Sequence, residues 1–316
     1  MNEFWTVLGA VLPVFCVTGV GALMRKLNWL TEEADHSLLR VTINVLVPCL
    51  IFDSTSSNAA LHRVSNVTIA PLIGFFTVVL GIFLAWIFRK ASGLNEIRQQ
   101  RTFAVSTGIY NYGYVPIPLI LLLFGQETVG VLFVHNVGVE IALWTVGLIL
   151  MSGASPGSEW HKIFNPPLIA VVVGLGFNLT GATSYIPGFL VTTIKMLGQC
   201  AIPMGIVLIG ATIADQIHEF HSDSAWQVLG MGCLFRLGVF PFLFVLAAKY
   251  CPLSLELKRI MVVQASMPAA VFPIVMAKHY GGDTATALRV VISTSALSLI
   301  TTPLWIRFGV KWIGLY

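Results

Sequence analysis

Charged residues are scarce in this chain of 316 amino acids. Asp, Glu, Lys and Arg together make up 10% of it, whereas a soluble globular domain carries about 25%. So few charges cannot cover the surface of a soluble protein of this length, which excludes a soluble enzyme and a disordered chain. The net charge of +4 is small and no polybasic run is present, so we expect no nucleic-acid partner. A membrane protein remains.

Cysteine pairs and enzyme motifs are lacking as well. The five cysteines include no Cys-x-x-Cys pair and lie in or beside apolar stretches, which predicts small buried hydrophobes rather than a metal site or disulfides. No P-loop, dinucleotide fingerprint or His-Glu-x-x-His motif occurs. Residues 153–157 match G-x-S-x-G, but they lie in a polar loop rather than between a strand and a helix. We therefore expect neither an enzyme nor a metal or other cofactor.

Long apolar runs are what the sequence has in abundance. Hydrophobic residues make up 56% of it, and the mean hydropathy is +0.85. The runs have the length of about 20 residues that a transmembrane helix needs, without the alternation of a barrel strand. We predict an all-α polytopic membrane protein with ten transmembrane helices, at residues 4–24, 37–57, 67–88, 101–124, 127–151, 166–180, 189–213, 225–248, 257–277 and 284–307.

The two halves of the chain share a pattern. A cation, an amide and a proline at four-residue spacing occur in the second and seventh predicted helices: Arg40, Asn44, Pro48 and Lys195, Gln199, Pro203. We predict a first five-helix repeat at 1–151, a connecting loop at 152–165 and a second repeat at 166–316. Because five is odd, the second repeat enters the membrane from the opposite side. Such inverted repeats are typical of transporters that expose one central site to either side in turn.

Helices four and nine contain matching helix breakers. Gly113, Pro116 and Pro118 interrupt helix four, and Pro268 and Pro273 interrupt helix nine. Proline frees a carbonyl of the preceding turn, and the N-terminus of a resumed helix attracts an anion. We predict that the two breaks meet in one cavity, with Tyr110, Asn111, Tyr112, Gln264 and Ser266 as substrate ligands. The alternative is a pair of kinked helices whose polar side chains only satisfy the freed carbonyls.

Several segments resemble the auxin efflux carrier (PIN-like) family, whose bacterial members include malonate and malate permeases. Residues 111–118 (NYGYVPIP) are similar to the family's N-x-G-F-x-x-x-P-L segment. Residues 44–52, 201–211 and 267–303 are similar to its second, seventh, and ninth to tenth helices. The resemblance implies two inverted repeats with crossed broken helices four and nine, and a scaffold of helices one, two, six and seven. The other six helices would form a transport domain that moves as an elevator.

The resemblance also implies site residues and partners. Plant relatives bind substrate with asparagines on helices four and five, and the matching positions are Asn111 and Asn136. The family further implies a homodimer through the scaffold helices. The long hydrophilic loop of the plant auxin exporters is missing, which favours a compact bacterial carrier of small mono- or dicarboxylates, such as malonate or malate, over an auxin exporter.

Charges within the predicted helices are candidates for function. Glu140 and Arg236 lie near the middle of helices five and eight. They could pair with each other, or Glu140 could couple proton movement. Arg289 could carry substrate charge or extend to the membrane surface, and Asp53 is a candidate cation ligand. His135, beside Asn136, is either a substrate ligand or a hydrogen-bonded core residue.

These patterns favour a secondary active or facilitative transporter of small organic anions in the bacterial inner membrane. The alternatives are a proton- or sodium-coupled symporter or antiporter of the same architecture, and a membrane sensor that binds its ligand without moving it. Lys and Arg are slightly more frequent in the loops opposite the termini, which places both termini outside. The partners we expect are the substrate anion, the lipid bilayer and a second copy of the chain.

Overall fold

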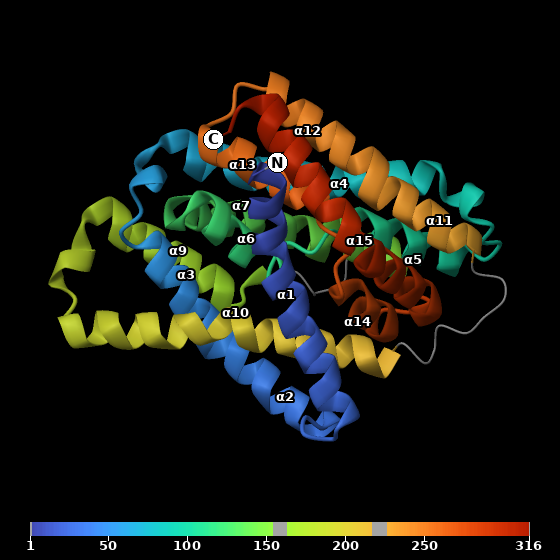
Figure 1. Cartoon of the computed structure of the whole chain (residues 1–316), viewed down its shortest axis with the longest axis horizontal. Coiled ribbons are helices and arrows are strands. Elements are labelled where there is room, and N and C mark those ends of the chain that lie inside the picture. The colour runs from blue at the N-terminus through green and yellow to red at the C-terminus, as the bar shows by residue number, and fades with distance from the viewer. Residues whose placement is uncertain (1, 154–162, 217–225, 316) are drawn as a thin grey trace.

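The computed structural model describes residues 2–153, 163–216 and 226–315 (Figure 1). Most of the predicted connecting loop, 154–162, therefore lies outside the described residues. Within them all regular secondary structure is helical, apart from one isolated β-bridge. Each predicted transmembrane segment overlaps a helix or a broken helix.

The first half contains five helical segments, two of which include a π-helical turn (η1 and η4) and one of which is broken. In chain order they are α1 (Asn2–Lys26); α2 (Glu32–Val41), η1 (Thr42–Leu46) and α3 (Val47–Thr55); α4 (Val64–Ile87); the broken pair α5 (Ile97–Gly108) and α6 (Pro116–Phe124); and α7 (Gln126–Ala142), η4 (Leu143–Gly147) and α8 (Leu148–Ser152). Short 3₁₀ helices follow α3 and α4, at η2 (Ala59–His62) and η3 (Arg89–Ser92).

The second half has the same order of segments, with one π-helical turn, η8. Its segments are α9 (Pro166–Thr180) with the 3₁₀ helix η6 (Ala182–Tyr185); α10 (Gly188–Gln216); α11 (Trp226–Leu234), η8 (Phe235–Val239) and α12 (Phe240–Tyr250); the broken pair α13 (Leu255–Ser266) and α14 (Phe272–His279); and α15 (Thr284–Ile313). In both halves the broken segment is the fourth.

Within the described residues, six helical segments are long and apolar enough to cross a membrane: Glu32–Thr55, Val64–Ile87, Gln126–Ser152, Gly188–Asp215, Trp226–Tyr250 and Thr284–Ile313. Pro166–Thr180 is apolar but shorter. Large side chains such as Phe76, Phe83 and Leu122 are exposed, as expected of a surface that faces lipid rather than water. The expectation of a polytopic, all-helical membrane protein is thus confirmed.

Helix starts are fixed by polar side chains that satisfy free N–H groups. The side chains of Thr31, Asn165, Ser254 and Asp283 each accept a hydrogen bond from the N–H three residues on. A helix leaves its first N–H groups without intrahelical partners, and in a membrane no water can replace them. These caps therefore set where α2, α9, α13 and α15 begin.

The helices form two packing groups, which we call the α10 group and the α15 group. In the α10 group, α10 packs against α1 and α3, and α3 packs against α9. In the α15 group, α15 packs against α5, α11 and α13, while α4 packs against α5 and α7. The two groups also touch each other, because α1 packs against α15 and α6. Figure 1 shows α2, α3 and α10 in the lower part of the molecule and α4, α11 and α12 in the upper part.

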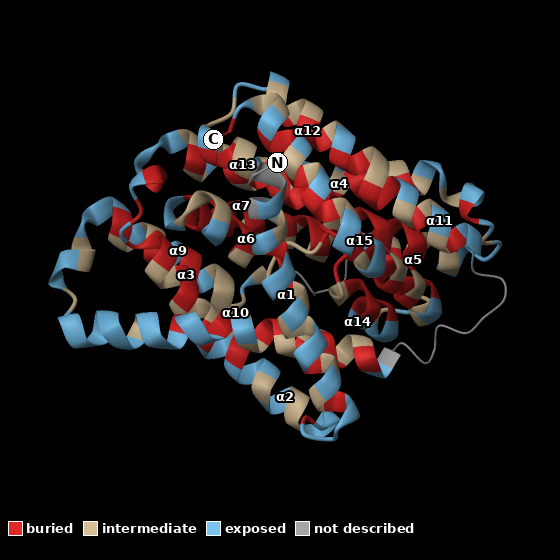
Figure 2. Ribbon diagram, viewed as in Figure 1, coloured by how far each residue is buried: buried red, intermediate tan, exposed pale blue. Residues whose placement is uncertain are grey.

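Burial is concentrated in the α15 group. Phe103, Val262 and Val291 are almost fully buried, and Figure 2 shows buried residues around α5, α14 and α15, whereas the outer end of α10 is exposed. Gly108, the last residue of α5, touches α4: a Cβ atom there would lie 2.4 Å from the Ile82 nitrogen. A side chain at position 108 would therefore clash with the backbone of α4.

Hydrogen bonds join the two groups where α3 meets α7. The Gln126 Nε2 donates to Ser54 Oγ at 2.8 Å, and the Asn58 Nδ2 donates to the Glu127 carbonyl at 3.0 Å. The Asn178 Nδ2 of α9 donates in turn to the Asn58 carbonyl at 3.0 Å. Asn58 thus contacts both groups at the start of the α3–α4 connection.

Candidate functional site

The two helix breaks lie where the sequence predicts them. The first spans 109–115, between α5 and α6, and contains Gly113; the second spans 267–271, between α13 and α14, and contains Pro268. Pro116 begins α6, with Pro118 in its first turn, and Pro273 is the second residue of α14. Proline is tolerated in a first helical turn because it needs no N–H donor there.

The two breaks pair with each other. Tyr110 and Ala269 form an antiparallel β-bridge. The Asn111 N–H donates to the Pro268 carbonyl at 2.8 Å, and the Ala270 N–H donates to the Ile109 carbonyl at 2.9 Å. Backbone groups freed by one break therefore find partners in the other, which is how an interrupted helix is tolerated in a membrane. We call this pairing the crossing.

Amide side chains gather on one side of the crossing. The Asn136 Nδ2 of α7 donates to the Tyr112 carbonyl at 2.8 Å. The Gln264 Nε2 of α13 lies 3.3 Å from Asn136 Oδ1 and 3.4 Å from the Tyr112 carbonyl oxygen. The buried Gln264 Oε1 has no hydrogen-bond partner among the described residues. We call Asn136, Gln264 and the Tyr112 carbonyl the amide cluster.

Asn111 belongs to the first break and directly precedes Tyr112 in the chain. Its backbone is held by Pro268, its side chain is half-buried, and the described part of the chain offers it no side-chain hydrogen bond. His135, fully buried, lies behind the cluster with its Nδ1 3.2 Å from Asn136 Oδ1. The structure thus brings Asn111, Tyr112, Asn136, Gln264 and His135 together.

Tyr110 and Ser266 point to structural partners instead. The Tyr110 hydroxyl lies 2.9 Å from Thr77 Oγ1 of α4, and the Ser266 hydroxyl donates to the Val263 carbonyl of its own helix at 2.7 Å. Both side chains are fully buried. In this conformation both hydroxyls have partners within the protein, but only that of Ser266 binds a backbone carbonyl, as the kinked-helix alternative describes.

Glu140 and Arg236 serve different breaks. Glu140 accepts hydrogen bonds from the Tyr112 hydroxyl at 2.7 Å and from the Trp144 Nε1 at 3.1 Å. Arg236 donates to the carbonyls of Met267 and Ala265, both at 3.1 Å. The predicted alternative in which the two charges pair is therefore wrong. The reason is local: Arg236 lies in the π-helical turn η8, from which its side chain reaches the second break.

Arg289 and Asp53 lie on other elements. Arg289 is half-buried near the start of α15, and Asp53 is half-buried on α3. Asp53 interacts electrostatically with Lys195 of α10. Within the described residues no group of three His, Cys, Asp or Glu side chains is arranged to hold a metal ion.

Two hydroxyls that the sequence did not single out support the second break. The Ala269 N–H donates to Thr294 Oγ1 at 3.1 Å, and the Thr302 hydroxyl donates to the Ser266 carbonyl at 2.8 Å. Both threonines are buried on α15. Their spacing of eight residues, which puts them on one face of a helix, is the signal that could have identified them.

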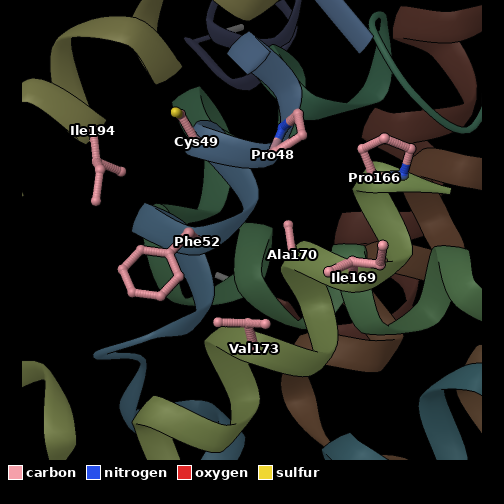
Figure 3. Close-up of a pocket in the computed structure, with 8 residues that line it drawn as sticks. All are labelled: Pro48, Cys49, Phe52, Pro166, Ile169, Ala170, Val173 and Ile194. Atoms are coloured by element: carbon pink, nitrogen blue, oxygen red, sulfur yellow. The ribbon is translucent and has the colours of Figure 1, made fainter. Parts of the chain in front are cut away.

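A groove lies away from the crossing, between α3, α9 and α10 (Figure 3). Its volume is about 340 Å³, and Phe52, Ile169, Val173 and Ile194 are among the residues that line it. The lining side chains are apolar apart from the Cys49 thiol. The groove offers no groups for an anion, so the amide cluster with Asn111 is the better candidate site.

Comparison with known proteins identifies the family of this chain. A family described as Membrane transport protein matches residues 6–159 and 154–306. The chain is 29% identical over 304 residues to an uncharacterized transporter of Methanothermobacter thermautotrophicus, covering 93% of this chain and 96% of that protein. It is 23% identical over 308 residues to an uncharacterized transporter of Methanocaldococcus jannaschii, covering 94% and 97%. Because the family match spans nearly the whole chain, this protein belongs to the Membrane transport protein family, which confirms the resemblance to auxin efflux carriers.

Proposed function

We propose that this protein is a secondary transporter of small organic anions, mono- or dicarboxylates such as malonate or malate, and uses no cofactor beyond a coupling ion. The observation that carries the proposal is the amide cluster at the point where two broken helices cross, with Asn111 in the first break. In the substrate complex Asn111 and Asn136 bind the carboxylate, with Gln264 and Tyr112 as further contacts. The N-termini of α6 and α14 add partial positive charge.

Movement of the α15 group against the α10 group would expose this site to each side in turn. The two groups have their own internal packing, and the crossing belongs to the α15 group. We propose that α1, α9 and the two broken segments cross the membrane too, giving ten crossings in two inverted repeats. The α10 group would stay fixed, as the scaffold of an elevator in the inner membrane with both termini outside.

We further propose that two copies associate through the scaffold. Phe189 and Met196 of α10 and Val172 of α9 are exposed apolar side chains, and the groove in Figure 3 lies between the same helices. A fixed partner there would leave the α15 group free to move.

Uptake by proteoliposomes tests the site. We expect Asn111→Ala and Asn136→Ala each to weaken the apparent affinity for labelled malonate or malate by about tenfold, because a hydrogen bond to a charged group contributes about 1.5–3 kcal/mol. The matched control is Asn95→Ala, an exposed asparagine before α5. Unchanged affinity in both site variants would refute the assignment, and ligand binding without flux would favour a sensor.

Coupling to protons or sodium is a second proposal, favoured by Glu140. Its carboxyl lies on a membrane-spanning helix, and its hydrogen-bond donors, Tyr112 and Trp144, are neutral. We expect Glu140→Gln to abolish the stimulation of uptake by an imposed pH gradient. A sodium requirement that survives in this variant would direct attention to Asp53, and Asp53→Asn would test it. Arg289 remains a candidate for substrate charge.

A further inference from the structure

Arg236 is a fully buried arginine that caps one half of the crossing. Its Nε and Nη2 donate to the carbonyls of Met267 and Ala265, which lie at the C-terminal end of α13. The last carbonyls of a helix have no intrahelical donor and carry its negative dipole end. The planar guanidinium supplies two donors at once, which a lysine cannot do in the same geometry.

The rest of the guanidinium lies among aromatic rings. Its central carbon is 5.3 Å from the ring centre of Tyr110, 5.2 Å from that of Phe240 and 5.9 Å from that of Phe244. The Nη1 nitrogen has no hydrogen-bond partner among the described residues. Aromatic faces attract a cation but leave its charge in place.

A carboxylate does not neutralise this charge. Arg236 takes part in none of the ion pairs within 4 Å that the described residues form. The carboxyl of Glu140 is directed to the other break, toward Tyr112 and Trp144. A lone arginine inside a membrane protein is costly, and such residues are retained for function.

The two residues whose carbonyls Arg236 binds are sequence neighbours of residues in the amide cluster and in the crossing. Ala265 follows Gln264 of the amide cluster, and Met267 precedes Pro268, whose carbonyl binds the Asn111 N–H. In a low-dielectric interior a charge interacts with groups that it does not touch. Hydrogen bonds from amides, in contrast, are available to neutral and anionic ligands alike.

We propose that Arg236 determines the preference of the crossing for negatively charged substrates, acting through space from behind the second break without touching the substrate. This inference rests on the proposed function, because it concerns the same site. In this proposal Arg236 makes the site prefer an anion to a neutral analogue, and the amide side chains determine which ligand shape the site accepts. Arg236 is thus a specificity-determining positioning residue.

The test compares two probes of one shape, malonate and its monoamide malonamate, which differ by one negative charge. Binding of both to the purified protein is measured for the wild type, Arg236→Gln and Arg236→Lys. We expect Arg236→Gln to lower the malonate-to-malonamate affinity ratio by about tenfold, which corresponds to about 1.4 kcal/mol. Arg236→Lys, which keeps the charge but not the two-pronged contact, should keep this ratio within about threefold while weakening both probes.

A purely structural role would weaken both probes equally, and an unchanged ratio in Arg236→Gln would therefore overturn the proposal. So would a ratio that falls in Arg236→Lys as far as in Arg236→Gln. If Arg236→Gln fails to fold, binding to the wild type can still overturn the proposal. Equal affinities for malonate, malonamate and the neutral diamide would show that the site does not respond to ligand charge. Binding of none of these probes by the wild type would instead overturn the proposed substrate class as well.

Discussion

The two broken helices perform the same structural task by different means. The first break is polar: Asn111 and Tyr112 belong to it, and the Tyr112 hydroxyl binds an acid, Glu140. The second break, 267–271, consists of apolar residues and relies on other helices, which supply Arg236 and Thr294. The first break thus contains polar side chains of its own, while the second is held in place by residues of other helices.

This difference shows how two helix breaks of similar form can be stabilised differently. Both breaks need partners for backbone groups that a continuous helix would satisfy. Pairing the breaks satisfies some of them, and side chains satisfy the rest. The side chains are free to differ between the halves: the first break has polar side chains of its own, and the second is supported by Arg236 and Thr294 of other helices.

The largest effect is expected at the end of α5, where the first break begins. A Cβ at Gly108 would lie 2.4 Å from the Ile82 nitrogen and 2.6 Å from its Cα, and backbone atoms cannot move aside. We expect Gly108→Ala to destabilise the protein by about 2 kcal/mol or more, seen as a lower thermal unfolding temperature in detergent. The control is Gly113→Ala in the same break, where nothing lies within 4 Å; equal losses in the two variants would contradict the packing argument.

A smaller effect is expected in the second break. Thr294→Val keeps the shape of the side chain but leaves the buried Ala269 N–H without its acceptor. Such an unsatisfied group costs about 1–3 kcal/mol, so the unfolding temperature should fall. Thr301→Val on the same helix is the control, because that hydroxyl only contacts the Leu297 carbonyl. If the two variants unfold at the same temperature, the second break does not depend on Thr294.

The smallest effect concerns the outer ends of the broken helices. Asp283 caps α15 and forms an ion pair with Arg98 of α5. Burial raises the pKa of Asp283, but hydrogen bonding from Thr286 and the Arg98 guanidinium outweigh it, so its pKa lies below the ordinary range. A lowered pKa means that the ionised group stabilises the fold above the ordinary aspartate pKa, and that this contribution is lost as pH falls through the folded-state value.

We therefore expect Asp283→Asn to lower the unfolding temperature slightly at neutral pH and to leave it unchanged at strongly acidic pH. The contribution is modest, because Arg98 is largely exposed and exposed ion pairs contribute about 0–1 kcal/mol. Unfolding measured from pH 7 to pH 3 checks this. A constant difference between the wild type and the variant across this range would rule out the ionised Asp283 as its source.

The breaks could be predicted from the sequence because proline acts locally. Pro116 and Pro273 lack the N–H that a continuous helix requires, and they are the first residue of α6 and the second residue of α14. The segment predicted at 166–180 coincides with α9 for a similar reason, since Asn165 caps it and Gly181 comes after it in a left-handed conformation. Local chemistry of this kind is visible in a single sequence.

The directions of side chains could not be predicted in the same way. Regular helical spacing assigns each residue to a face, but the π-helical turns η4 and η8 rotate the faces of the helices α8 and α12 that continue from them. Arg236 lies in η8, and its side chain binds the second break rather than pairing with Glu140. The hydrogen-bond partners of the Tyr110 and Ser266 hydroxyls are likewise not visible in the spacing. Tyr110 contacts Thr77 of another helix, and Ser266 contacts Val263 of its own helix.

The contacts of Asn58 have a consequence for kinetics. Its side chain binds the Glu127 carbonyl of the α15 group, and its carbonyl binds Asn178 of the α10 group, so α7 cannot slide along α3 while these hydrogen bonds last. Under the proposed movement of the α15 group, the barrier between inward- and outward-open forms would include the breaking of these hydrogen bonds and of the one between Gln126 and Ser54. Contacts remote from the proposed site would then act on the turnover rate rather than on affinity.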